Sequence, residues 1–220
     1  YMRKKILFLA GMMACCSLAG AQEISKTWVA DKGNGTYQNP VLHADYSDPD
    51  VCAAGDDFYM TASSFNCIPG IPILHSNDLV NWSLVNYALP IQEPEEFFDK
   101  AQHGKGVWAP AIRFHNGEFY IYWGDPDYGI YMIKAKDPKG RWSKPVLVKA
   151  GKGMIDPTPL WDEDGKVYLV HAYAGSRSGV NSIVVICELN AEGTEVISDP
   201  VMVFAVSYTH LRAHETPEHL

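Results

Sequence analysis

The sequence predicts an all-β fold in which four-stranded sheets pack around one axis as the blades of a β-propeller. Three observations lead to this prediction. From residue 39 onward, short β-type runs alternate with turn residues, and helical periodicity is almost absent. The runs repeat as three units of four strands each. A single four-stranded sheet cannot bury both of its faces, so such units must pack on one another.

The three units follow one another along the chain, with the same order of strands in each. We predict the first at residues 47–51, 57–61, 71–76 and 81–85, the second at 108–112, 118–122, 129–133 and 145–148, and the third at 155–159, 166–170, 183–186 and 200–204. In each unit a tight turn joins the first two strands. These turns are Gly55-Asp56, Asn116-Gly117 and Asp164-Gly165, and each supplies a residue that tolerates positive φ. Between the first two units, one helical turn is expected within residues 93–102.

The repeat also predicts where the candidate catalytic residues lie. The first strand of each blade lines the propeller axis, so equivalent positions at the start of these strands converge. The equivalent pairs are Asp48-Pro49, Ala109-Pro110 and Asp156-Pro157. Two carboxylates from separate blades, those of Asp48 and Asp156, are therefore expected at one end of the axis.

The first 21 residues have the pattern of a secretory signal peptide. Three basic residues (3–5) precede an apolar run over residues 6–14, and Ala19-Gly20-Ala21 is a small-x-small cleavage site. The apolar run is too short for a permanent membrane span. We therefore expect a secreted or periplasmic protein; lipid anchoring through Cys15 or Cys16 is the less favoured alternative.

The remaining chain divides into three parts. Residues 22–38 are polar and contain several glycines, so we interpret them as a linker or N-terminal extension. Residues 39–205 form a partial propeller of blades 1–3. Residues 206–220 do not continue the blade pattern, and they resemble the in-frame translation of an adapter used in sequencing libraries. We interpret the chain as a truncated fragment that ends in this artefact.

Composition excludes several functional classes. The net charge is −8 and the one basic run lies in the leader, so nucleic-acid binding is not expected. The five cysteines have no CxxC spacing, and the histidines lack the spacing of metal ligands, so no metal site or cofactor is predicted. Twelve tyrosines and six tryptophans suit sugar stacking, because an aromatic face packs well on the C–H face of a sugar ring.

Paired carboxylates in a pocket are the machinery of glycoside hydrolysis. An inverting enzyme needs a base that activates water and an acid that protonates the leaving oxygen, whereas a retaining enzyme uses one carboxylate as nucleophile. A further carboxylate nearby raises the pKa of the acid by like-charge repulsion. The spacing of Asp48 and Asp156 in the sequence does not separate these mechanisms.

Several motifs occur in order between residues 37 and 204: Asn39-Pro-Val-Leu, Tyr46-Ser-Asp-Pro49, Asp57-Phe-Tyr59, Ser63-Ser-Phe65, residues 69–76 (PGIPILHS), Asp78-Leu-Val-Asn-Trp82, Gly106-Val-Trp-Ala-Pro110, Ile155-Asp-Pro-Thr-Pro159 and residues 164–169 (DGKVYL). Together these motifs closely resemble glycoside hydrolase family 43. The resemblance implies a five-bladed propeller, of which about three blades are present here. It also implies an inverting enzyme of the β-xylosidase or α-L-arabinofuranosidase type, which acts on xylan, arabinoxylan or arabinan.

The resemblance also implies roles for individual residues. Asp48 matches the general base, and Asp156 matches the carboxylate that tunes the pKa of the acid and orients it. The general acid of the family is a Glu in the next blade, and no matching motif occurs in this sequence; we attribute its absence to truncation. Without that acid, the fragment is expected to be inactive.

Three aromatic residues are candidates for substrate binding. Phe65 and Trp108 lie near matching axis-facing loops and are expected to form a wall of the sugar subsite; the alternative for both is core packing. Trp123 is placed at the pocket rim, together with Asp125 and Asp127, although residues 125–127 also read as a solvated turn. Some family members hold a structural calcium ion on the axis, but the usual histidine for it belongs to a later blade, so no metal is assigned.

Two other functions remain open from the sequence. The first is a retaining propeller hydrolase that cleaves fructan or sucrose, which would also use an early Asp. It is disfavoured because Ser47 and Ile155, which precede the two Asp-Pro pairs here, differ from the residues that such enzymes carry at these positions. A non-catalytic glycan-binding propeller would keep the aromatic wall and lose a carboxylate. Both Asp48 and Asp156 are present, which argues against a non-catalytic propeller, but the missing Glu leaves that alternative open for this chain.

Overall fold

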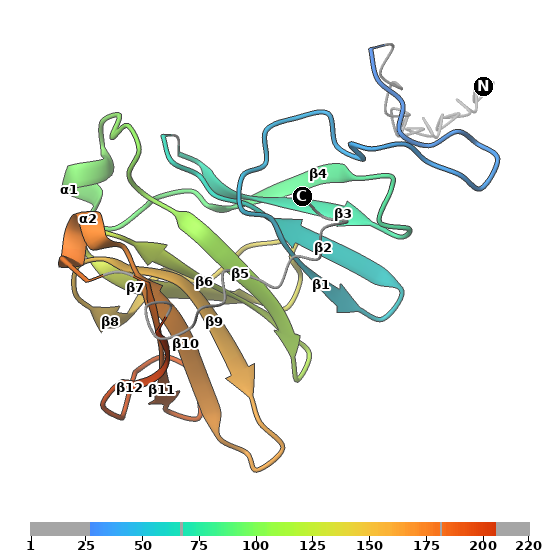
Figure 1. The fold of residues 1–220 in the computed structure, drawn as a ribbon. Helices are drawn as coiled ribbons and strands as arrows, with labels where there is room; N and C mark the ends of the chain where they lie inside the picture. Colours follow the sequence, from blue (N-terminus) through green and yellow to red (C-terminus); the bar gives the residue numbers. More distant parts are fainter. Residues whose placement is uncertain (1–26, 67, 181, 206–220) are drawn as a thin grey trace, which may run out of the picture.

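The computed structural model describes residues 27–66, 68–180 and 182–205. These residues form three four-stranded antiparallel sheets, which Figure 1 shows fanned around one side of a common axis. The predicted all-β propeller architecture is confirmed, with one sheet for each predicted unit. The predicted leader (residues 1–21) and the predicted adapter-derived segment (206–220) lie outside the described residues.

Each sheet is built from four strands that are consecutive in the sequence. The strands are β1 (Asp50–Ala54), β2 (Asp57–Thr61), β3 (Gly70–Ser76), β4 (Ser83–Leu89), β5 (Trp108–His115), β6 (Glu118–Asp125), β7 (Gly129–Ala135), β8 (Val146–Ala150), β9 (Met154–Trp161), β10 (Val167–Tyr173), β11 (Ile183–Leu189) and β12 (Val201–Ala205). Two short helices, α1 (Glu95–Phe98) and α2 (Gly175–Ser178), lie in connecting segments. The helical turn expected within residues 93–102 is α1, whereas α2 was not predicted.

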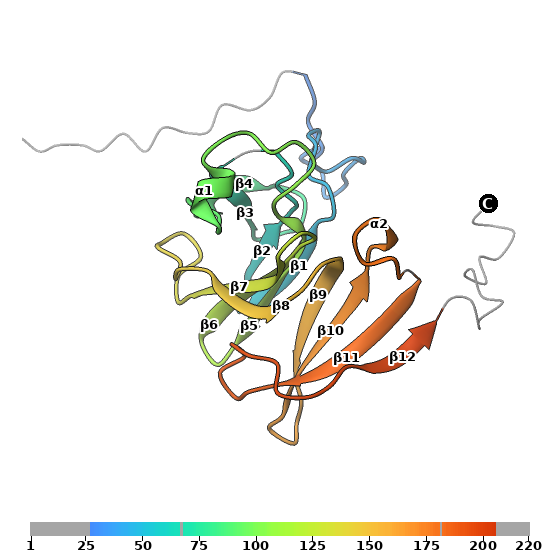
Figure 2. The same ribbon diagram turned by 90° about the vertical axis from the view of Figure 1, so that its left-hand side faces the viewer.

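Strand order places the first strand of every sheet at the same edge. The sheets have the orders β1-β2-β3-β4, β5-β6-β7-β8 and β9-β10-β11-β12. The strand β1 contacts β5, and β5 contacts β9, so these three first strands lie side by side along the axis (Figure 2). All three run in the same direction in Figure 1, and their N-terminal ends therefore meet at one end of the axis.

The hydrophobic core lies between the blades. Alternate residues of β6 point to opposite faces, as strand geometry requires. Phe119 and Ile121 pack with β3 and β7 in the interface between blades 1 and 2, whereas Tyr120 and Tyr122 pack with β10 in the interface between blades 2 and 3. Since both faces of β6 are buried, the second blade holds the other two together.

The N-terminal extension is docked on the first blade. An isolated bridge pairs Asp31 with Tyr37. Asn81 donates its side-chain N–H to Asp31 Oδ2 over 2.9 Å. The described part of the predicted linker, residues 27–38, is thus a short loop with fixed contacts. Among the described residues, no helix is long and apolar enough to cross a membrane.

Candidate active site

Three equivalent residues at the axis share an uncommon backbone conformation. Asp48, Ala109 and Asp156 have φ angles of 50°, 36° and 54°, in the left-handed region that favours glycine. Each of them precedes a proline, which normally pushes the preceding residue to extended conformations. Such strain persists only where the surrounding structure enforces it. The repeated geometry holds the side chains of Asp48 and Asp156 at the same end of the axis.

The carboxylate of Asp48 is oriented by two hydroxyl groups. Ser63 Oγ donates to Asp48 Oδ2 over 2.7 Å, and Ser47 Oγ donates to the same oxygen over 2.9 Å. Ser63 Oγ also accepts the backbone N–H of Ala109 over 2.9 Å. Ser63 therefore connects the carboxylate of blade 1 to the equivalent position of blade 2, a role that the sequence motif around Phe65 did not reveal.

The second carboxylate, that of Asp156, lies within electrostatic reach of the first. Burial, which removes water from the carboxyl group, is the larger cause that raises the pKa of Asp156. The negative charge of Asp48 raises this pKa further. The contacts of β1 with β5 and of β5 with β9, together with the matching backbone conformations, place both residues at the same end of the axis. Such a pair can divide the tasks of activating water and tuning a neighbouring acid.

Two aromatic residues, Phe65 and Trp108, lie in the segments next to Ser63 and Ala109. The rings of Phe65 and Trp108 meet edge to face, with their centroids 6.1 Å apart, and both are partly exposed. An isolated bridge between Ser64 and Val107 joins the two backbone segments. Phe65 follows Ser63 by two residues and Trp108 precedes Ala109, so both rings belong to the segments that the Ser63 hydroxyl joins. We refer to these two rings as the aromatic wall; that it lines a sugar subsite stays a prediction.

The structure does not place Trp123 at the pocket rim. Its side chain is 1% exposed and stacks on Tyr131, with the ring centroids 5.6 Å apart. Trp123 belongs to the core between blades 1 and 2, because β6 is covered on both faces. A ring buried in this way offers no face to a sugar, so the predicted substrate contact of Trp123 is wrong for this structure.

The residues near Trp123 divide between core and surface. Asp125 is fully buried at the end of β6, so residues 125–127 are not the solvated turn that the sequence also allowed. Asp127 is partly exposed, and its Oδ1 accepts a hydrogen bond from Arg177 Nε over 3.1 Å. Arg177 lies on α2 and was not predicted, because a four-residue helix in a loop has no periodicity to reveal it.

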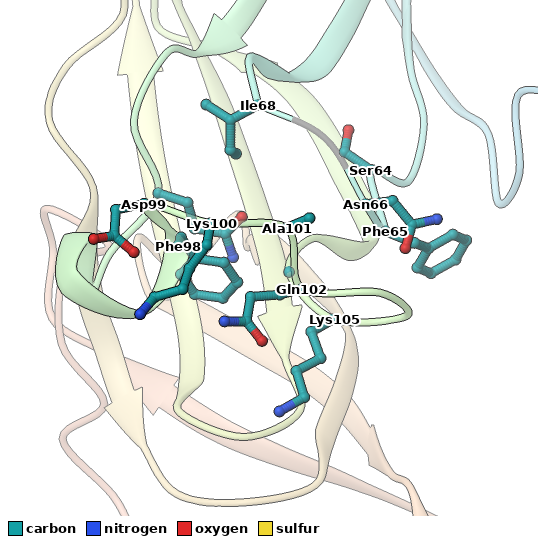
Figure 3. Close-up of a pocket in the computed structure, with 12 residues that line it drawn as sticks. Ser64, Phe65, Asn66, Ile68, Phe98, Asp99, Lys100, Ala101, Gln102 and Lys105 are labelled. Carbon is teal, nitrogen blue, oxygen red and sulfur yellow. The ribbon is translucent and has the colours of Figure 1, made fainter.

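A surface pocket is lined in part by Phe65, one of the two aromatic residues. It has a volume of about 370 Å³ and lies between the segment around Phe65 and the segment around α1. Figure 3 shows Phe65 at one edge of this pocket and Asp99 at the opposite edge. Gln92, which is 2% exposed, also lines it. The pocket shares Phe65 with the candidate site and offers space next to it.

Within residues 27–66, 68–180 and 182–205, no group of three or more His, Cys, Asp or Glu side chains is arranged to hold a metal ion. His171 is buried, with 1% of its surface exposed.

Comparison with known proteins gives a consistent result. The family model described as "Glycosyl hydrolases family 43" matches residues 37–220, a range that includes residues 206–220; an adapter origin for that segment stays a prediction. A β-xylosidase of Formosa agariphila is 34% identical over 198 residues, which cover 84% of this chain and 33% of the relative. A non-reducing end α-L-arabinofuranosidase of Bacteroides ovatus is 38% identical over 139 residues, covering 61% of this chain and 26% of the relative.

A solved structure agrees with the fold. The GH43 protein BlXynB of Bacillus licheniformis, as its K247S mutant, aligns with a TM-score of 0.65 and 33% identity, over 76% of this chain and 33% of the solved one. The chain thus spans about a third of the length of the relatives that it matches.

Proposed function

The chain belongs to glycosyl hydrolase family 43, and we propose that it acts in the hydrolysis, with inversion, of xylosyl or arabinofuranosyl linkages in plant cell-wall polysaccharides. The described residues form three blades of a five-bladed propeller. The observation that carries the proposal is the pair Asp48 and Asp156, which have matching backbone conformations at one end of the axis. The names of the relatives, β-xylosidase and α-L-arabinofuranosidase, support the substrate class.

In this proposal Asp48 is the general base. Within the described residues, its hydrogen bonds with Ser47 and Ser63 both use Oδ2, which leaves Oδ1 to accept a hydrogen from the attacking water. The fixed orientation matters because an inverting base must hold water on the face of the sugar opposite to the leaving group.

The role proposed for Asp156 is to tune and orient the general acid. The negative charges of two nearby carboxylates raise the pKa of a third carboxyl group, which keeps it protonated for transfer to the leaving oxygen. We propose that this third group is a Glu in the part of the relatives' length that the chain does not match. Glu188 is a poor candidate, since it forms an ion pair with Lys166.

The anomer of the first product tests the proposal. Residues 27–205 would be placed in a chain of the relatives' full length, and hydrolysis of an aryl β-xyloside would be followed by ¹H NMR. Inversion predicts α-xylose as the first product. The Asp48→Asn variant should lower kcat by roughly 10²–10⁴, the usual contribution of general base catalysis. If β-xylose appears first, the mechanism is retaining and the proposal fails. Sugar binding without hydrolysis would favour a glycan-binding propeller.

The 220-residue chain by itself is expected to lack glycosidase activity. In this proposal the general acid lies in the part of the relatives' length that the chain does not match. Release of the aryl group from an aryl xyloside should therefore match the buffer control. Turnover above that control would show that the chain supplies its own acid.

We also propose that the protein is exported, on the basis of the basic, apolar and small-residue pattern of residues 1–21. The polymeric substrate class supports this, because polysaccharides are too large to enter a cell. Mass spectrometry of the N-terminus after expression in a bacterial host should show cleavage after Ala21. An intact N-terminus in the cytoplasmic fraction would contradict export.

A further inference from the structure

Three loop segments meet at the side chain of Asp127, in the turn between β6 and β7. Arg177, on α2 of the third blade, donates Nε–H to Asp127 Oδ1 over 3.1 Å. Lys105, from the segment before β5, places its Nζ 3.9 Å from Asp127 Oδ2. The side chains of Arg177 and Lys105 are about one third exposed, at 30% and 34%. The cluster therefore forms part of the surface.

Arg177 also lies over the aromatic wall. Its guanidinium carbon is 5.9 Å from the centroid of the Trp108 ring, within the range of a cation–π contact. A guanidinium carries five N–H donors. In the described part of the chain, the hydrogen bonds of the Arg177 side chain are those of Nε to Asp127 and of Nη1 to Ser176 Oγ, at 3.4 Å. The remaining N–H groups are available to a ligand.

This cluster is tied to the segment that leads into Asp156. The backbone N–H of Gly153 donates to Pro126 O over 2.7 Å, in the turn that carries Asp127. The carbonyl of Gly153 accepts the N–H of Ala174 over 2.7 Å, directly before α2. In Figure 2, α2 lies at the end of β10 next to the start of β9, where Asp156 is located. Arg177 and the carboxylate pair thus share one end of the axis.

We propose that Arg177 is a substrate-binding residue, whose guanidinium donates hydrogen bonds to hydroxyl groups of a pentose unit that stacks on Trp108 and Phe65. The proposal rests on the proposed function, since it takes the pair Asp48 and Asp156 as the place of bond cleavage. Asp127 balances the charge of Arg177 and fixes the plane of its guanidinium. A neutral sugar with adjacent hydroxyl groups suits this site, because a planar fork of donors can contact two oxygens at once.

Binding to the 220-residue chain tests the inference without requiring catalysis. The probes are xylotriose and arabinotriose, with cellotriose as a hexose comparison, titrated into ¹⁵N-labelled protein. The signals to follow are the Arg177 Nε–Hε and Trp108 Nε1–Hε1 resonances. We expect saturable shifts of both with a pentose trimer. The dissociation constant should rise at least tenfold in Arg177→Ala and less in Arg177→Lys. Asp127→Asn, which keeps the guanidinium but loosens it, should fall between wild type and Arg177→Ala.

The matched control is Arg141→Ala, which removes an exposed arginine from the loop before β8 and should leave binding unchanged. If Arg177→Ala, Arg177→Lys and Asp127→Asn all bind the pentose trimer as tightly as wild type, the inference fails while the proposed function stands. If cellotriose alone binds and binding depends on Arg177, the pentose substrate class fails while the role of Arg177 in sugar binding stands. If wild type shows no saturable shift with any trimer, the inference is overturned.

Discussion

Replacing Asp125 by Asn should change how the stability of the protein depends on pH. Asp125 is completely buried at the end of β6. Its Oδ1 accepts the backbone N–H groups of Asp127 and Tyr128, and Gln92 donates a side-chain N–H to Oδ2 over 3.2 Å. Burial is the largest influence and raises the pKa of Asp125 from 3.8 to about 6, against the hydrogen bonds, which lower it.

The contribution of Asp125 to the free energy of unfolding follows from its pKa in the unfolded and in the folded protein. A rise from 3.8 to about 6 corresponds to about 3 kcal/mol, at roughly 1.4 kcal/mol for each pH unit. Because the folded protein holds the proton more tightly than the unfolded chain, this stabilisation is complete below pH 3.8. It is lost as the pH rises through about 6. The Asp125→Asn variant has no such proton, so relative to wild type it should gain roughly 2–3 kcal/mol between pH 4 and 7.5.

The assay is urea unfolding of both proteins at pH 4 and 7.5, followed by tryptophan fluorescence. Other groups titrate in this window. Burial lowers the pKa of His171, which removes stability as the pH falls, and the pKa of Asp156 is raised, which acts in the opposite direction. Both groups occur in both proteins, so the difference between wild type and variant isolates Asp125. The exposed carboxylate variant Glu163→Gln should show no such change. A wild-type-minus-variant difference that stays the same at both pH values would refute the reasoning.

Two further predictions test the geometry around the candidate site. Gly153→Ala should destabilise the protein by about 2–4 kcal/mol in urea unfolding, because φ is +77° and a Cβ would lie 2.7 Å from the Cβ of Ser178. The control Gly165→Ala, at φ +83° with no atom within 4 Å of the added Cβ, should lower the free energy of unfolding by only about 1–2 kcal/mol. An equal loss of stability in both variants would contradict the close packing of α2 against Gly153. Ser63→Ala should speed amide hydrogen exchange at Ala109 by about tenfold, because the backbone N–H of Ala109 loses a hydrogen bond worth about 1.4 kcal/mol. An unchanged exchange rate would show that Ser63 does not hold Ala109 in solution.

The strands were predictable because their signals are local. Alternating β-type runs and turn residues such as Asn116-Gly117 report on a few neighbouring positions, and the twelve strands agree with the predicted units. The ends differ by a few residues: β6, for example, continues to Asp125, beyond the predicted end at residue 122. The end of a strand depends on its partner in the sheet, which sequence periodicity does not show.

The carboxylate pair was predictable for a related reason. The repeat makes Asp48 and Asp156 equivalent, and equivalent positions of successive blades converge on the axis. What the repeat could not show is the backbone conformation that Asp48, Ala109 and Asp156 share. It also could not show the hydroxyl of Ser63, which bridges two blades.

Packing between the blades decided which aromatic and charged side chains are buried and which residues they contact. Trp123 looked like a rim residue beside two aspartates, yet it is buried because β6 is covered on both faces. Arg177 and Asp127 are 50 residues apart in the sequence, and only the approach of α2 to the turn between β6 and β7 joins them. The sequence by itself determined the blades and the two axial carboxylates, because their signals are local or repeated. Only the tertiary structure decided what surrounds them, because those contacts join loops of different blades, whose meeting depends on how the sheets pack.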